Sequence, residues 1–287
     1  MADCTGVIRQ LFIYPIKSCA GVEVTQAELT ATGLRMDREW MIVDQHGMFL
    51  TQRECPHMVW ITPALSATAL TLSAPGFAPV SISLDLAPAP RTVTVWRDTL
   101  SGDDQGDAVA NWLDGFLAVP GKQYRLIRFS KQARRLSDLD WTKGVEATNK
   151  FSDGFAVQVV TQSALDEFNE RLAAQGHEPV SMLRFRPNII LDDIDAHTED
   201  NLDDLVIHAE GGSVELGLVK PCPRCAVPNI DPLTALSSTE VNDTLQAYRK
   251  LARVNDAICF GMNAIVKTGI GHTIAVKQTV EGNFAFD

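Results

Sequence analysis

Alternating hydrophobic and polar positions in the first hundred residues predict a series of short β-strands. The runs are rich in β-branched and aromatic residues, and turn residues such as Gly76 and Pro79 separate them. Their spacing is typical of an all-β sandwich or barrel. We therefore expect a β-barrel or sandwich module with strands at residues 8–14, 22–29, 40–43, 48–51, 58–61, 69–73, 80–84 and 92–96.

A helical periodicity appears at residues 107–117, where the apolar side chains share one face. A strand at 124–129 and a polar excursion at 130–150, which we interpret as a surface loop or lid, come next. Ser163 is the predicted N-cap of a second helix, and a capping box at 237–240 predicts a third that ends near 251. The other predicted strands end at residue 160 or span 189–191, 205–207, 214–219, 259–266 and 273–276. The fold class is mainly β with α.

The composition is that of a soluble globular protein. The 287 residues are 45% hydrophobic and 21% charged, and we expect no signal peptide at the N-terminus. No run in the sequence approaches the ~20 apolar residues that a membrane span needs. Six cysteines without the spacing of a disulfide framework fit a reducing compartment. The net charge of −11 argues against a nucleic acid or an anionic membrane as partner. We expect a cytoplasmic protein.

Residues 219–232 contain the densest candidate chemistry. Four prolines surround Cys222, Arg224 and Cys225, which predicts a rigid loop that is neither helix nor interior strand. A structural zinc site, a thioredoxin-type redox pair and an iron–sulfur cluster each lack the required ligands or helix. Two interpretations remain: one thiolate that binds the metal of a cofactor, or a loop with two buried cysteines.

Several cations stand in motif-like stretches dense in Gly, Pro and Trp. If they converge, they form a basic pocket for a small anion in an otherwise acidic protein, and if not, they are ordinary surface charges. These residues are Lys17, Arg38, Arg53, Lys220 and Arg224.

Seven short motifs, in order along nearly the whole chain, resemble those of MOSC proteins. The similarity is to the branch with an N-terminal β-barrel that includes the mitochondrial amidoxime-reducing component and its bacterial relatives. The motifs are YPIKSC at 14–19 with Gly21, MDREW at 36–40, TQR at 51–53, FSD at 151–153, FRPN at 185–188, CPRC at 222–225 and DP at 231–232.

The resemblance implies an N-terminal β-barrel module at residues 1–120, a MOSC β-barrel domain at 121–287 and a molybdenum cofactor with a phosphorylated pterin. Cys225 is then the protein ligand to molybdenum, with Cys222 nearby but not bonded to the metal. Arginine and lysine donors suit the phosphate, and a cationic neighbour favours the thiolate. The cofactor contacts implied are Lys17, Ser18, Arg38, Arg186, Asn188 and Arg224, with Arg53 a weaker candidate.

The implied activity is reduction of small N-hydroxylated compounds such as amidoximes, hydroxylamines and N-hydroxylated bases. Asp153 is a candidate proton donor or substrate contact, although it can also be a turn or capping residue. Electrons would come from a separate ferredoxin, flavodoxin or reductase, because the chain ends without cluster cysteines. We also expect no N-terminal membrane anchor of the kind that the mitochondrial members carry. Gly154 and Phe155 depart from the family pattern after FSD, so the family's cofactor or substrate contacts do not carry over to these two positions.

Two alternative functions stay open. MOSC domains also occur at the end of cofactor sulfurases, so Cys225 or Cys222 could carry a persulfide, although no pyridoxal-phosphate domain is present here. The second alternative is a carrier that stores the molybdenum cofactor without catalysis. Trp60 is interpreted as a core residue, and His57 is given no role.

Overall fold

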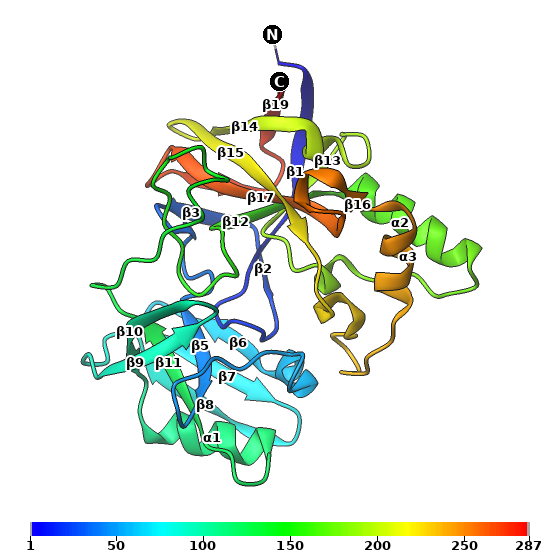
Figure 1. Ribbon diagram of the computed structural model, residues 1–287. Coiled ribbons are helices and arrows are strands. Elements are labelled where there is room, and N and C mark those ends of the chain that lie inside the picture. The colour runs from blue at the N-terminus through cyan, green and yellow to red at the C-terminus, as the bar shows by residue number, and fades with distance from the viewer. Residues whose placement is uncertain (1, 286–287) are drawn as a thin grey trace.

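The computed structural model describes residues 2–285 and has two lobes (Figure 1). It is mainly β, with 42% of residues in strands and, within the described range, three α-helices. Both termini lie at the far end of the upper lobe, while α1 (Asp107–Leu117) covers the far end of the lower lobe. The mainly β fold class with a barrel is therefore confirmed.

The upper lobe is a closed barrel. Its seven strands run in the order β12-β13-β1-β19-β14-β15-β17, and a further pairing of β17 with β12 closes the ring. Each adjacent pair is antiparallel except β12 and β13, which are parallel. The strands are β1 (Cys4–Ile13), β12 (Val157–Thr161), β13 (Ile189–Asp192), β14 (Leu202–Ala209), β15 (Gly212–Pro223), β17 (Ala257–Thr268) and β19 (Thr279–Phe284).

The barrel is filled by aliphatic side chains that alternate inward along its strands, such as Ile8, Leu205 and Leu216. Outside it, α2 (Gln162–Ala174) and α3 (Glu240–Tyr248) pack over an aromatic layer in which Phe185 stacks on Phe260 with centroids 4.0 Å apart. Short strands extend the lobe: β2 (Val22–Val24), β3 (Gln26–Thr30), β4 (Gly33–Leu34), β16 (Lys250–Leu251) and β18 (Thr273–Ala275).

The lower lobe consists of two sheets and α1. One sheet has the order β5-β11-β10-β9 and the other β6-β7-β8. Trp40 and Leu70, one from each sheet, meet Leu113 of α1 in a common core. The strands are β5 (Trp40–Asp44), β6 (Thr62–Leu65), β7 (Ala69–Ala74), β8 (Phe77–Ser83), β9 (Pro90–Val95), β10 (Asp98–Asp104) and β11 (Tyr124–Phe129).

The chain crosses between the lobes twice. β1 pairs within the upper barrel, the following segments descend to β5, and the chain returns after β11 (Figure 1). β11 lies beyond residue 120 but pairs with β5 and β10 of the lower lobe. The division at residues 120 and 121 stays a prediction. The crossings place residues 14–21 and 35–39 near the junction of the lobes, where the candidate site lies.

Three predicted elements in the first part of the chain are wrong in detail. Residues 58–61 are not a strand, because Pro56 starts a 3-10 helix, η1 (Pro56–Trp60). Residues 48–51 make only isolated bridges with Val43 and Thr94 instead of a hairpin strand. The strand predicted at 22–29 is divided into β2 and β3. β10 was not predicted from the sequence, because Leu100 is its one large apolar residue and the mostly polar sequence shows no strand pattern. The strand is formed by pairing with β9 and β11.

Both predicted helix caps are also wrong. Thr161 is the N-cap of α2, and the Ser163 hydroxyl donates to the Ile194 carbonyl at 2.6 Å instead. α3 begins at Glu240 with Thr239 as N-cap and without a side-chain cap hydrogen bond. The short helices are η2 (Met182–Arg184), η3 (Thr198–Asn201), η4 (Val227–Asn229) and η5 (Ala252–Val254).

The proline-rich segment does not exclude a strand, contrary to the sequence prediction. β15 continues through Pro223 and pairs with β17, with register shifts between Leu218 and Lys220 and between Pro221 and Pro223. Bulges of this kind accommodate residues that lack an N–H donor. The strand therefore delivers Cys222 directly to the junction between the lobes.

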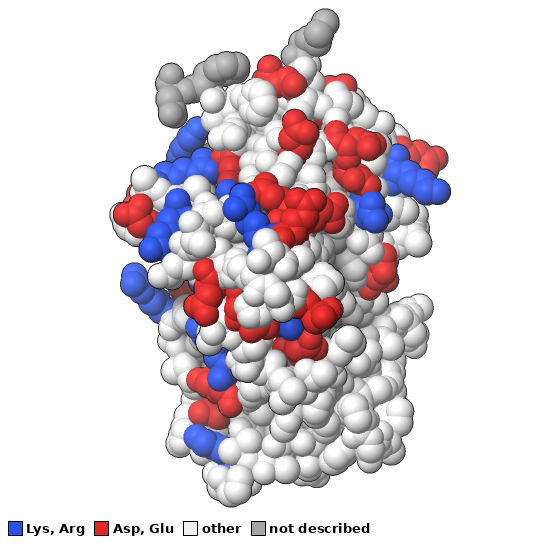
Figure 2. All heavy atoms as spheres, turned by 90° about the vertical axis from the view of Figure 1, so that its right-hand side faces the viewer, with Lys and Arg blue, Asp and Glu red and all other residues white. Residues whose placement is uncertain are grey.

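Where the upper lobe faces the viewer in Figure 2, the surface carries acidic side chains interspersed with lysines and arginines. Asp and Glu side chains gather there, while the lower part of the same face carries few charges. None of the helices within residues 2–285 is long and apolar enough to cross a membrane.

Candidate functional site

A cavity of about 120 Å³ lies at the junction of the lobes, and we call it the cationic cavity. The structure brings most of the predicted site residues together in its wall, from segments far apart in the sequence. They are Lys17, Ser18, Arg38, Asp153, Arg186, Asn188, Arg224 and Cys225. Gly154 and Phe155, the departure from the family pattern, lie in the same wall.

Three wall residues adopt the left-handed backbone conformation that non-glycine residues rarely use. These are Ser18 (φ 65°), Arg38 (φ 44°) and Arg186 (φ 58°). Tertiary hydrogen bonds hold the segments in place: the Arg38 N–H donates to the Tyr14 carbonyl and the Lys17 N–H to the Trp40 carbonyl, both at 2.8 Å. Backbone strain of this type, about 1–3 kcal/mol per residue, concentrates at ligand-binding sites.

Tyr14 lies between two of the arginines. The guanidinium carbons of Arg38 and Arg186 are each 4.3 Å from the centre of its ring. Arg38 also donates to the Arg186 carbonyl at 3.0 Å, and Arg186 donates to the Cys19 carbonyl at 2.7 Å. Burial lowers the pKa of Arg186 to about 10 and raises that of Tyr14 to about 12. At neutral pH the stack is therefore a neutral phenol between two cations.

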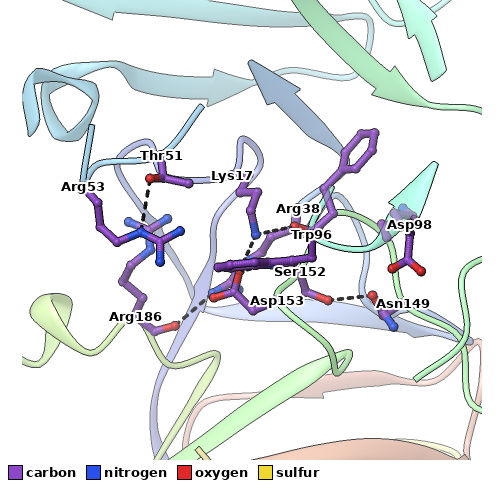
Figure 3. Close-up of polar contacts among 12 residues, drawn as sticks. Lys17, Arg38, Thr51, Arg53, Trp96, Asp98, Asn149, Ser152, Asp153 and Arg186 are labelled. Carbon is purple, nitrogen blue, oxygen red and sulfur yellow. Dashed lines mark hydrogen bonds and ion pairs between the residues drawn. The ribbon is translucent and has the colours of Figure 1, made fainter. Parts of the chain in front are cut away.

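Lys17 is buried and paired with Asp153 (Figure 3). Its ammonium donates to the Phe151 carbonyl at 2.9 Å and to Asp153 Oδ1. Burial lowers the pKa of Lys17, while the attraction of Asp153 opposes this. The Asp153 side chain is exposed, and the desolvation of its carboxylate at the cavity wall is outweighed by the attraction of Lys17, which holds the pKa of the carboxyl well below its usual range. Asp153 is thus ionised at neutral pH, which favours a hydrogen-bond acceptor over a proton donor.

The two cysteines of the CPRC motif differ in their surroundings. Cys225 is exposed and lines the cavity, so the interpretation of two buried cysteines is wrong. The Arg224 guanidinium contacts Cys222 rather than Cys225, with Nη1 donating to the Cys222 sulfur at 3.0 Å and Nη2 to the Phe185 carbonyl at 2.8 Å. Burial nevertheless raises the pKa of the Cys222 thiol. Cys225 is the more accessible metal ligand.

Two of the predicted cations are outside the cavity wall. Arg53 lies over the Trp96 ring at 4.9 Å, near the Lys17–Asp153 pair (Figure 3). Lys220 lies over Trp141 at 4.7 Å, where it packs the excursion against the barrel. Only part of the predicted cationic set therefore converges.

Asn188 and Trp96 have roles that the sequence motifs do not reveal. The Asn188 amide donates to the Phe12 carbonyl and accepts from the Gln158 N–H, both at 3.1 Å, so it ties β1 to β12 behind the cavity. Trp96 donates from its indole nitrogen to Asp153 Oδ1 at 3.2 Å. No pattern marks Trp96, because it follows a strand of the lower lobe and meets Asp153 only in the folded chain.

The cavity retains unused hydrogen-bond donors. Among the described residues, Arg186 Nη2 and Arg224 Nε are buried without a partner. Unpaired buried donors are costly, so they indicate acceptors that the protein itself does not provide. They lie beside Lys17, which is paired with Asp153, and Arg38, which is paired with Asp37 at 2.7 Å. This set of donors suits a ligand with several anionic oxygens, and the exposed Cys225 sulfur suits a soft metal. The residues fit a phosphorylated, metal-carrying cofactor.

Comparison with known proteins assigns both parts of this architecture. Residues 5–120 match the MOSC N-terminal beta barrel domain, and residues 146–281 match the MOSC domain. Mitochondrial amidoxime-reducing component 1 of Homo sapiens is 35% identical over 263 residues, which cover 85% of this chain and 72% of the human protein. The chain belongs to the MOSC family. Mitochondrial amidoxime reducing component 2 of Rattus norvegicus is 32% identical over 259 residues, with the same coverage.

The cationic cavity of this MOSC protein lies between the two matched regions. Lys17 and Arg38 come from the first region, while Asp153, Arg186 and Cys225 come from the second. Neither region alone contains the full set of cations and the exposed thiol.

Proposed function

We propose that this MOSC protein is a molybdenum-cofactor-dependent reductase of N-hydroxylated compounds, such as amidoximes, hydroxylamines and N-hydroxylated bases. One observation carries the proposal: a cavity with unpaired arginine donors lies beside an exposed cysteine in a chain similar to amidoxime-reducing components. The donors suit the anionic part of such a cofactor and the sulfur suits its metal.

The chain's own residues bind and orient the cofactor. Lys17, Ser18, Arg38, Arg186 and Arg224 would hold its anionic oxygens, and Cys225 would be the one protein ligand to molybdenum. When bound, the cofactor supplies the two-electron chemistry that removes the oxygen of an N–OH group. The net reaction consumes two electrons and two protons and releases the amine-type product and water.

Asp153 holds a negative charge at the cavity wall. Its carboxylate accepts hydrogen bonds from Lys17 and Trp96, so it fixes the buried ammonium and orients the indole beside it. With 76% of its side chain exposed, it retains acceptor capacity toward a substrate N–H or O–H group. It acts as an orienting contact in this scheme.

The electron source in this proposal is a separate protein of the ferredoxin, flavodoxin or reductase type. A cytoplasmic location is proposed with it. The names of the relatives place those proteins in mitochondria, so fractionation of cells that make this chain is the direct measurement of its own location.

Metal analysis combined with a turnover assay tests the proposal. Protein made in molybdenum-supplemented cells is assayed with benzamidoxime and a chemical reductant. A reductase contains molybdenum and forms benzamidine, whereas a cofactor carrier contains molybdenum without turnover. A sulfur-transfer protein that uses the exposed Cys225 releases cyanolysable sulfur instead. Absence of turnover in molybdenum-loaded protein contradicts the proposed function.

A further inference from the structure

A second cavity, of about 450 Å³, adjoins the cationic cavity, and we call it the apolar cavity. The two share Arg186 and Val227 in their walls. Val227 is two residues after Cys225, so the shared wall lies next to the proposed metal ligand. The apolar cavity provides nearly four times the volume of the cationic one.

Most of its wall is hydrophobic and comes from both lobes. Val59 and Trp60 of η1 in the lower lobe face Leu183, Ile230 and Leu233 of the upper lobe. The Trp60 indole donates to the Leu233 carbonyl at 2.9 Å, which joins the two sides. Trp60 thus lines the cavity rather than belonging only to the core. His57 stacks on Trp60 with ring centres 4.8 Å apart and so packs against this wall residue.

Two buried polar groups of this wall lack a hydrogen-bond partner within residues 2–285, and both belong to residues that also form the arginine–tyrosine stack. Tyr14 and Arg186 line the apolar cavity, and their buried Oη and Nη2 atoms have no partner among the described residues. Tyr14 is only 1% exposed. Arg184, another polar wall residue, is occupied by Asp231 at 2.9 Å and by the carbonyls of Pro228 and Asn229.

We infer that the apolar cavity is the substrate pocket of the proposed reductase and selects N-hydroxylated compounds with a planar apolar body. This inference rests on the proposed function. Ligand pockets typically have volumes of ~300–1,000 Å³, lie between domains and combine an apolar wall with few polar groups. The polar head of the substrate is directed at the shared wall, where Arg186 offers a donor and Tyr14 lies next to it in the wall of the apolar cavity, while the body packs on Trp60 and Leu233.

A phosphorylated pterin suits this cavity less well. Such a molecule has many hydrogen-bonding atoms and an anionic tail, and the matching cations Lys17, Arg38 and Arg224 line the other cavity. Apolar walls give affinity in proportion to the apolar area that they bury. A small N-hydroxylated compound without an apolar body gains little from them, so the cavity discriminates between substrates by the size of the body.

Two pairs of variants test the inference. Ala74→Phe fills the cavity from the end of β7, and Ala67→Phe is its control, because Ala67 is exposed in the preceding turn and outside the cavity. Leu233→Ser removes an apolar wall residue that is 83% exposed, and Leu236→Ser changes a residue of the same loop, 71% exposed, that does not line the cavity.

Benzamidoxime and hydroxylamine are compared as substrates, and molybdenum content is measured for every variant. Ala74→Phe is expected to raise the KM for benzamidoxime about tenfold and Leu233→Ser severalfold, with kcat/KM for hydroxylamine unchanged within about twofold. Both control variants should behave as wild type. Ligand-observed NMR without reductant should show weaker benzamidoxime binding by Ala74→Phe than by Ala67→Phe.

Equal effects on both substrates, or none on either, would overturn the inference. Loss of molybdenum from Ala74→Phe with its retention in Ala67→Phe would also overturn it, because the cavity would then hold the cofactor. If the wild-type protein binds benzamidoxime in this cavity without reducing it, the proposed reductase activity is contradicted and the assignment of the cavity as a binding pocket still holds. If the wild-type protein reduces both substrates and the variants behave like it, only the assignment of the apolar cavity as the substrate pocket is contradicted.

Discussion

The Trp96 indole nitrogen donates to the Asp153 carboxylate at 3.2 Å. Trp96 follows β9 of the lower lobe in a left-handed conformation with φ 55°, and Asp153 precedes β12 of the barrel. Lys17 reaches the same carboxylate from the segment that connects the lobes. The position of Asp153 is therefore fixed by both lobes, and its charge supports a buried ammonium (Figure 3).

Replacement of Asp153 should make cofactor retention more sensitive to alkali. Burial lowers the pKa of Lys17, and Asp153 is the largest influence that raises it again. In Asp153→Asn that influence is lost, so Lys17 becomes neutral at a lower pH and releases an anionic ligand earlier. Molybdenum retained after dialysis over a neutral-to-alkaline series measures this, and the point of loss should move to lower pH.

Trp96→Phe is the matched control for Asp153→Asn. It removes a hydrogen bond to the same carboxylate but keeps the negative charge beside Lys17. The alkaline limit of Trp96→Phe should match that of wild type. An equal shift in both variants would show that the carboxylate acts by its geometry and not by its charge.

The two cysteines of CPRC should differ in their effect on activity. Cys225→Ala removes the exposed sulfur that lines the cavity, so molybdenum-dependent turnover of benzamidoxime should be abolished. Cys222→Ala removes a less exposed thiol with a raised pKa, which accepts from Arg224 in the cavity wall, and a loss of about 10-fold is expected, as for neighbours of metal ligands. Equal losses of turnover and molybdenum in the two variants would contradict the assignment of Cys225.

Removal of an arginine from a buried ion pair should cost more unfolding free energy than removal of one from an exposed ion pair. Arg249 pairs with Asp200, and their side chains are 8% and 9% exposed. Arg249→Met leaves the carboxylate buried without its cation, which typically costs about 3–5 kcal/mol in the free energy of unfolding. Arg134→Met breaks a pair whose side chains are 59% and 61% exposed, where about 0–1 kcal/mol is typical. Urea denaturation of both variants measures the difference, and similar values would contradict it.

Glu199 should make the protein less stable as the pH rises. Burial raises its pKa from 4.5 to about 7, and it accepts from the Thr161 N–H at 3.2 Å and hydroxyl at 3.0 Å. A raised pKa in the folded state gives stability that is complete below the unfolded pKa and is lost as the pH rises through about 7.

Glu199→Gln removes that titration while it keeps a neutral side chain of similar shape. Above neutral pH, its melting temperature should exceed that of wild type by about 2–4 °C for each kcal/mol of unfolding free energy that wild type loses through the ionisation of Glu199. The difference should vanish or reverse in mildly acidic buffer. Parallel curves of melting temperature against pH for the two proteins would show that Glu199 does not titrate in this range.

Periodicity predicted elements well where local pattern and packing agree. Residues 107–117 form α1 with Val109 and Leu113 buried, and residues 124–129 form β11, both with the predicted bounds. Where tertiary pairing outweighs local preference, prediction failed: β10 is polar but lies between two strands, and Pro221 is accommodated in a bulge of β15.

The sequence by itself determined the mainly β fold class, the family motifs and the candidate chemistry, because strand periodicity and short motifs are local properties. Only the tertiary structure decided which candidates meet. It placed Lys17 and Arg38 in the wall of the same cavity as Cys225, turned Lys220 toward Trp141, and brought Trp96 to Asp153. It also formed the apolar cavity, since Trp60 and Leu233 are distant in the sequence and meet only when the lobes pack together. Distances between remote side chains depend on how the backbone crosses between the lobes, and no local pattern of residues records that path.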